Sequence, residues 1–121
     1  MSAAAWVLVA ATGGLGALAR YAVDQRVTAR VAGSLPVGTL AVNCSGTLAL
    51  GLITGAGVGG DVALVVGAGA IGSYTTFSTW MYETHRLAEE GQARAARLNL
   101  AVSMVAGLAC AGAGWALGSL L

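Results

Sequence analysis

The residues of this chain that are best suited to chemistry lie in one uncharged segment, residues 72–80, which reads Gly-Ser-Tyr-Thr-Thr-Phe-Ser-Thr-Trp. Five serine and threonine hydroxyls and one tyrosine stand there. Glycine, serine and β-branched threonine in succession disfavour an uninterrupted helix, and a break would aim backbone carbonyls at one point. Carbonyl oxygens suit a small hard cation such as Na⁺, whereas hydroxyl and amide donors favour an anion. The segment therefore predicts an ion site and leaves the sign of the ion open.

Polar side chains recur at helical spacing in two other apolar stretches. Thr39, Asn43 and Thr47 are four residues apart and share one helix face, and so do Asn99 and Ser103. Hydrogen bonds between helices, of about 0.5–2 kcal/mol each, are enough to explain the threonines and the serine. Asn43 differs because its carboxamide brings two donor hydrogens and an acceptor into an apolar run. We expect it to face a cavity or a polar ligand.

Two aromatic residues follow the hydroxyl run. Phe77 and Trp80 are three residues apart, so they share a face if the chain resumes helical form there. Ring edges carry partial positive charge and can contact an anion. Packing against other helices is the competing explanation, and the residue types alone leave both open.

The elements that position these residues follow from the composition. The chain is 57% hydrophobic and 9% charged, and its uncharged intervals are residues 1–19, 31–60, 62–82 and 98–121. About 20 helical residues cross a hydrocarbon core about 30 Å thick, so each interval is long enough for one crossing. We predict an all-α, multi-pass protein of the cell membrane, of the bacterial inner or plasma membrane type, surrounded by the lipid bilayer.

One four-helix unit is expected over residues 1–121, with the third helix broken near mid-membrane. The predicted spans are residues 4–21, 37–54, 62–82 and 98–119. A polar connection that includes residues 24–30 follows the first span, and Pro36 suits the first turn of the second. The polar stretch 83–97 is predicted to continue as helix and to turn at Gly91.

Small residues within the spans predict close helix contacts. The first span contains Gly13, Gly14 and Gly16, and the second contains Gly51 and Gly55 at G-x-x-x-G spacing. In lipid, such residues let the backbones of two helices approach each other. We expect a neighbouring helix to pack at both places.

Several classes of function are disfavoured. A net charge of +1, with no basic strip and no interleaved aromatics, argues against a nucleic-acid partner. No nucleophile, base and orienting group can be placed together, so the chain is not expected to be an enzyme. Cys44 and Cys110 lack C-x-x-C spacing and are expected to pack as small apolar residues. Residues 17–19 resemble a signal-peptidase site, but no basic residue precedes the apolar run, which favours a retained helix.

Three motifs resemble those of the CrcB/Fluc fluoride channels. Residues 13–21 (GGLGALARY) are similar to the first-helix motif of that family, residues 38–46 (GTLAVNCSG) to the second, and residues 69–80 (GAIGSYTTFSTW) to the third. Glu83 follows at the family's spacing. The motifs extend over the chain in the family's order, which makes the resemblance specific.

The resemblance implies a passive, fluoride-selective channel that exports fluoride from the cytoplasm and relieves fluoride toxicity. Two subunits would pack antiparallel, with two pores at their interface. Such a pore replaces the water around fluoride with weak, distributed donors, so that the ion leaves as well as enters.

The resemblance also implies roles for particular residues. Arg20 would collect anions in an aqueous vestibule. The backbone carbonyls of Gly72 and Thr75, from both subunits, would hold a structural Na⁺ at the centre of the dimer. The fluoride pore would be lined by amide, hydroxyl and aromatic groups from Thr39, Asn43, Phe77, Trp80 and Ser103.

Trp80 departs from the family pattern, because phenylalanine is common at its position. An indole is bulkier and brings an N–H donor. It could narrow a pore, donate to fluoride directly, or disable half of the aromatic pair. The sequence leaves these three possibilities open.

The charges predict one orientation in the membrane. All six arginines lie in or beside the first and third connections, which four crossings place on one side, and the other side has none. The positive-inside rule then places both termini outside the cytoplasm. An antiparallel homodimer needs both orientations of one sequence. We therefore expect a related subunit with the opposite bias as partner, with a homodimer as the alternative.

Two rival functions fit four short helices. A small multidrug/proton antiporter would need a carboxylate within a span, and the first span has none, while Glu83 lies at a helix end. His85 is expected at the interface rather than in proton coupling. A purely structural subunit would not need Asn43 or a broken third span. The sequence therefore favours the channel.

Overall fold

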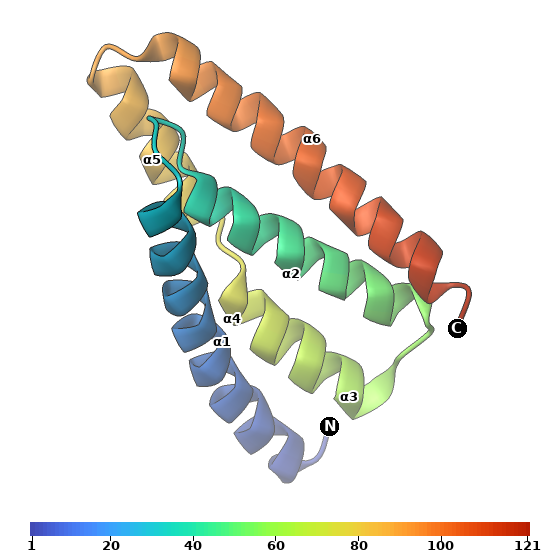
Figure 1. Cartoon of the computed structure of the whole chain (residues 1–121). Helices are drawn as coiled ribbons and strands as arrows, with labels where there is room; N and C mark the ends of the chain where they lie inside the picture. The colour runs from blue at the N-terminus through green and yellow to red at the C-terminus, as the bar shows by residue number, and fades with distance from the viewer.

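The computed structural model describes residues 1–121 as helices joined by short turns (Figure 1). Four helices are long and apolar enough to cross a membrane, as the composition predicts. The first, second and fourth crossings are single helices, while the third is divided into four pieces. In chain order these are α1 (Ala3–Arg30), α2 (Val37–Gly55), α3 (Gly60–Ala63), η1 (Leu64–Ile71), α4 (Gly72–Tyr74), α5 (Ser78–Glu89) and α6 (Ala93–Gly118).

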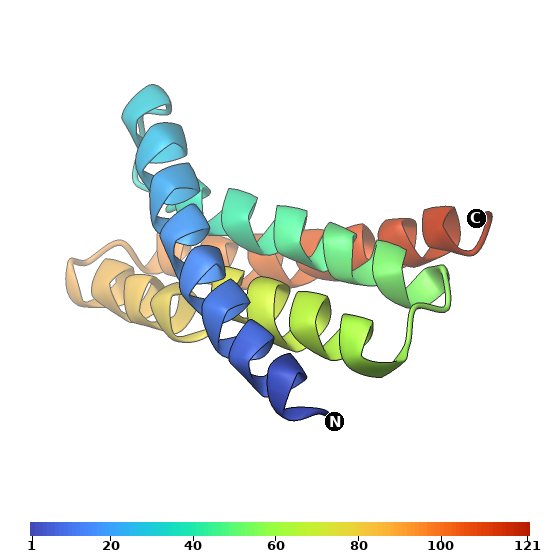
Figure 2. The ribbon, with the colours of Figure 1, turned by 90° about the horizontal axis from the view of Figure 1, so that it is seen from below.

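The first helix is longer than the predicted span, and the expected polar connection is helical. Helix α1 continues through residues 24–30 and ends at Arg30. No glycine or proline interrupts this stretch, and Thr28 Oγ1 donates to Asp24 Oδ1 one turn earlier at 3.2 Å. Arg30 lies in the last turn, where a cation is favoured by the helix dipole. Figure 2 shows these turns rising away from the other helices.

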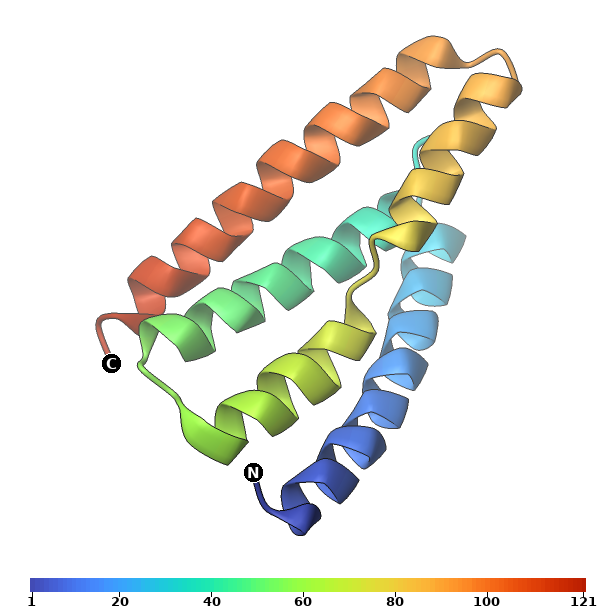
Figure 3. The same ribbon diagram turned by 180° about the vertical axis from the view of Figure 1, so that it is seen from behind.

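The third crossing is broken where the hydroxyl-rich segment predicts. Before the break it contains η1, a π-helix, and Thr12 Oγ1 of α1 donates to the Val65 carbonyl there at 3.0 Å. After α4 the chain becomes extended at Thr75, with φ −78° and ψ 159°, and helix resumes at Ser78 (Figure 3). The polar stretch then continues in α5 and turns at Gly91, whose φ is +78°, as predicted.

Glycine permits close contact between helices α1 and η1. A Cβ atom added at Gly16 would meet the carbonyl oxygen of Ala70 at 2.3 Å, and one at Gly69 would meet Thr12 Oγ1 at 2.4 Å. The two backbones therefore approach each other at small residues, as the glycine-rich first span predicts.

Helices α2 and α6 run parallel, and glycines of both helices lie where the two backbones meet (Figure 1). A Cβ atom at Gly51 would meet the Ala111 carbonyl oxygen at 2.3 Å, and one at Gly55 would meet that of Trp115 at 2.2 Å. On the other helix, Cβ atoms added at Gly114 and Gly118 would meet carbonyl oxygens of α2 equally closely. The G-x-x-x-G spacing in the second span thus marks a real helix contact.

Alanine at Gly114 is expected to destabilise the fold by about 2 kcal/mol or more, because its methyl group would overlap the Leu48 carbonyl oxygen, 2.2 Å from the new Cβ. Gly112 is the matched control, since a Cβ atom there has no neighbour within 4 Å. Thermal unfolding in detergent would measure both variants. Equal midpoints for Gly114→Ala and Gly112→Ala would contradict this packing.

The four crossings place the chain's connections at two ends. The end of α1 and the turn between α5 and α6 lie at one end of the molecule, and both termini lie toward the other (Figure 1). All six arginines of the chain therefore lie toward one end. Many large apolar side chains remain exposed, as expected for a protein whose surroundings are lipid.

Candidate functional site

Asn43 bridges the break in the third crossing. From helix α2, its Nδ2 donates to the carbonyl of Thr76 at 2.8 Å, and its Oδ1 accepts from the Thr76 amide at 2.8 Å. The carboxamide thus replaces the hydrogen bonds that the interrupted helix lacks. One of its two donor hydrogens serves Thr76, which leaves the second for another acceptor.

The two carbonyls predicted to hold a cation have lost their helical donors. The amide of Thr76, which would serve the Gly72 carbonyl in a continuous helix, donates to Asn43 instead. The amide of Thr79, which would serve the Thr75 carbonyl, donates to Thr76 Oγ1 at 3.2 Å. Because Asn43 and Thr76 accept these two amides, the carbonyl oxygens of Gly72 and Thr75 keep no helical donor. Carbonyl oxygens are ligands that suit a hard cation such as Na⁺.

A groove of about 320 Å³ lies beside the break. It contains four of the predicted pore residues, Asn43, Phe77, Trp80 and Ser103, which come from helices α2, α5 and α6 and the loop before α5. The remaining lining is Thr47, Thr75, Thr76, Met104, Gly107, Leu108 and Ala111. Amide, hydroxyl and aromatic groups therefore share one mainly apolar groove wall.

The aromatic pair has a defined geometry. The rings of Phe77 and Trp80 meet edge to face, with centroids 5.6 Å apart and an interplanar angle of 89°. The Phe77 side chain is 69% exposed, whereas Trp80 is buried. Trp80 Nε1 donates to the backbone carbonyl of Asn99 at 3.1 Å, so this N–H is occupied within the chain. Of the three possibilities for the indole, the structure favours bulk over direct donation.

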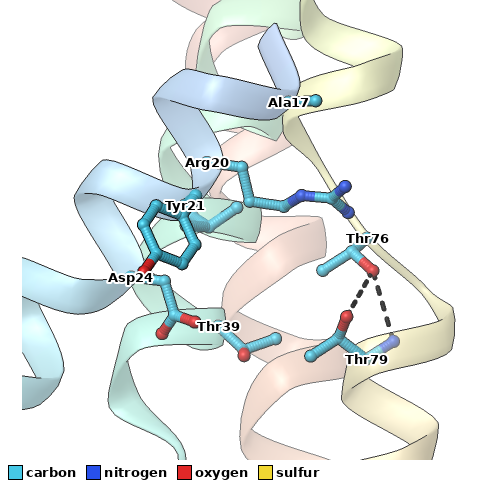
Figure 4. A pocket seen from close by; sticks show the side chains of 8 residues that line it. Ala17, Arg20, Tyr21, Asp24, Thr39, Thr76 and Thr79 are labelled. Carbon is cyan, nitrogen blue, oxygen red and sulfur yellow. Dashed lines mark hydrogen bonds between the residues drawn. The ribbon is translucent and has the colours of Figure 1, made fainter. Parts of the chain in front are cut away.

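A second, smaller cavity of about 190 Å³ holds Arg20 and Thr39 (Figure 4). Arg20 extends its guanidinium toward Thr76, and Asp24 lines the same space. Arg20 forms no ion pair; among the arginines, only Arg86 is paired, with Glu90. The sequence placed Thr39 with the pore residues, but it lies in this cavity and not in the groove.

Thr39 also holds the carboxylate that follows the third motif. Its Oγ1 donates to Glu83 Oε1 at 3.0 Å, while Glu83 Oε2 is buried without a hydrogen-bond partner. The bond joins α2 to α5 near the cavity of Arg20. The carboxylate therefore lies beside the site and not within the groove.

Thr76 is the residue that the sequence analysis missed. It lines both the groove and the cavity of Arg20, bonds Asn43 through its backbone, and bonds Thr79 through its hydroxyl. The hydroxyl run contains it, but only the position of the break singles it out among five similar residues. Thr76 therefore lies between the groove and the cavity of Arg20.

Comparisons with known proteins identify the family of this chain. The model of the family described as CrcB-like protein, Camphor Resistance (CrcB), matches residues 7–115. A protein of Mycolicibacterium paratuberculosis named Fluoride-specific ion channel FluC 2 is 48% identical over 118 residues, which cover 98% of this chain and 97% of that protein.

Other organisms carry similar proteins. Proteins with the same name from Mycobacterium tuberculosis and Haloarcula marismortui are both 46% identical, over 92% and 89% of this chain and 88% of each relative. All of these relatives are named as ion channels, in agreement with the prediction that the chain is not an enzyme. With its four membrane-spanning helices and a family match over most of its length, the chain is a multi-pass membrane protein that belongs to the CrcB family.

Proposed function

We propose that this chain is a subunit of a passive, fluoride-selective channel that exports fluoride from the cytoplasm. The observation that carries the proposal is the groove beside Asn43, where one amide hydrogen remains free after the bond to Thr76 is made. The names of the relatives support fluoride as the ion. Export requires no energy input, because the ion follows its own gradient.

The groove suits a small anion that must exchange water for protein donors. Asn43 offers an N–H, Ser103 a hydroxyl, and Phe77 a ring edge, and all three line one space. Each contact is weak, so none traps the ion. The unpaired guanidinium of Arg20 attracts anions to the neighbouring cavity before they lose water.

A structural Na⁺ at the centre of an antiparallel dimer completes the proposal. The carbonyls of Gly72 and Thr75 would supply two oxygens from one subunit, and the same residues of the partner would supply two more. What supports this is that both carbonyls lack their helical donors. The groove is open on one side in the single chain, which leaves room for a second subunit to form the opposite wall.

Fluoride efflux from liposomes tests the function directly. Purified chain, with and without a candidate partner subunit, is reconstituted in vesicles loaded with fluoride or chloride, and external halide is recorded. Rapid loss of fluoride but not chloride, without a proton gradient, is expected. Replacing Na⁺ on both sides by a large organic cation should abolish the flux. If no preparation conducts fluoride, the proposed function is wrong. If fluoride flux persists without Na⁺, the proposed Na⁺ site is wrong, but the channel function stands.

The six-to-zero arginine bias makes orientation the test of the partner. Reporters at the C terminus that are active only in the cytoplasm or only outside should show this chain, expressed alone, with its termini outside. Such a chain would need a related subunit of opposite bias to form the antiparallel dimer. Equal signals from the two reporters would instead support a homodimer.

A further inference from the structure

Trp80 is held by a closed ring of hydrogen bonds between α5 and α6. Trp80 Nε1 donates to the backbone carbonyl of Asn99 at 3.1 Å, the side-chain Nδ2 of Asn99 donates to Thr84 Oγ1 at 2.8 Å, and Thr84 Oγ1 donates to the backbone carbonyl of Trp80 at 2.8 Å. All three residues are buried, with exposures of 8%, 4% and 9% for Trp80, Asn99 and Thr84. Each of the three side chains is therefore hydrogen-bonded and shielded from solvent.

This ring sets the aromatic wall of the groove. Phe77 is largely exposed and meets Trp80 edge to face, so the position of its ring depends on the indole. The indole in turn is fixed to α6 through Asn99. Ser103 lies one turn beyond Asn99 on the same helix and lines the groove, so the same contact also sets its position relative to Phe77.

We infer that Thr84 and Asn99 are positioning residues, which hold Trp80 and through it the Phe77 ring at the geometry that conduction needs. The inference rests on the proposed channel function and adds two residues that touch neither the groove nor the ion. Trp80 acts in it as a fixed wall, because its only side-chain donor is used by the backbone carbonyl of Asn99. Neither Thr84 nor Asn99 lines the groove.

The pair Thr84→Val and Thr84→Ser tests the inference. Valine keeps the shape of threonine but leaves Asn99 Nδ2 without its acceptor, whereas serine keeps the hydroxyl. We expect Thr84→Val to lower fluoride efflux per reconstituted dimer about fivefold, equivalent to about 1 kcal/mol. Thr84→Ser should conduct within about twofold of the original chain.

Fluorescence anisotropy of Trp80 separates positioning from a general loss of stability. In a Trp6→Phe, Trp115→Phe background, first compared with the unmodified chain for efflux, Trp80 is the only tryptophan. Thr84→Val should lower its anisotropy, and Thr84→Ser should not. The inference is wrong if Thr84→Val conducts fluoride at the original rate, or if Thr84→Ser loses as much efflux as Thr84→Val. It is also wrong if Thr84→Val lowers efflux while the anisotropy of Trp80 stays unchanged. If the unmodified chain itself fails to conduct fluoride, the proposed function fails, and the anisotropy still decides whether Thr84 holds Trp80.

Discussion

Replacing Asn43 by aspartate is expected to lower fluoride efflux by at least about a hundredfold, equivalent to about 2.8 kcal/mol. An ionised carboxylate would repel fluoride and the Thr76 carbonyl that the Asn43 amide now serves at 2.8 Å. A protonated carboxyl would restore that bond, but it has one O–H and so no donor remains for the ion. The substitution therefore removes the fluoride contact in either protonation state.

Thr54→Val is the matched control for Asn43→Asp. Thr54 lies on the same helix, and its hydroxyl bonds only the carbonyls of Leu50 and Gly51 in its own turns. It lines neither the groove nor the cavity of Arg20, so efflux should be unchanged. Efflux by Asn43→Asp at the original rate, from vesicles with equal amounts of folded protein, would show that Asn43 does not contact the ion.

Replacing Phe77 by isoleucine is expected to lower fluoride efflux by at least about tenfold, equivalent to about 1.4 kcal/mol. The change removes a ring edge that carries partial positive charge beside the groove and ends the edge-to-face contact with Trp80. Because the Phe77 side chain is 69% exposed, the fold should lose little stability. Reduced efflux with an unchanged thermal midpoint would identify a role in conduction.

Tyr82→Ile controls for the loss of an exposed aromatic ring. Tyr82 is 64% exposed, lies on the same helix α5, and lines neither space. Its replacement should leave efflux within about twofold of the original rate. If Phe77→Ile conducts as well as Tyr82→Ile, the aromatic edge is not part of the fluoride path.

Composition and residue propensities predicted the four helical crossings and the break in the third correctly, but they placed the end of the first helix too early. The length of each uncharged interval and the cost of exposing backbone to lipid require four helical crossings. Glycine, serine and threonine between residues 72 and 78 predict where the third crossing is interrupted. Polarity after Tyr21 suggested a loop, but polar residues without glycine or proline extend a helix equally well beyond the membrane.

The resemblance predicted one pore lined by five residues, and the structure brings four of them together. Asn43, Phe77, Trp80 and Ser103 line one groove, whereas Thr39 shares the other cavity with Arg20. Helical spacing tells which side chains share a face, but it does not tell which neighbouring helix that face meets. That is why Thr39 and Asn43, which share one face of α2, line different spaces.

The membrane fold, the interrupted third crossing and the residue types that suit ions follow from composition and local backbone preferences, so the amino-acid sequence was enough to predict them. The hydrogen-bond partners of those residues became known only from the folded arrangement of the helices. The amide of Asn43 is shared between the broken backbone and the groove, and the indole N–H of Trp80 is used by Asn99. Such pairings depend on how three separate helices meet, and no spacing within one segment encodes them.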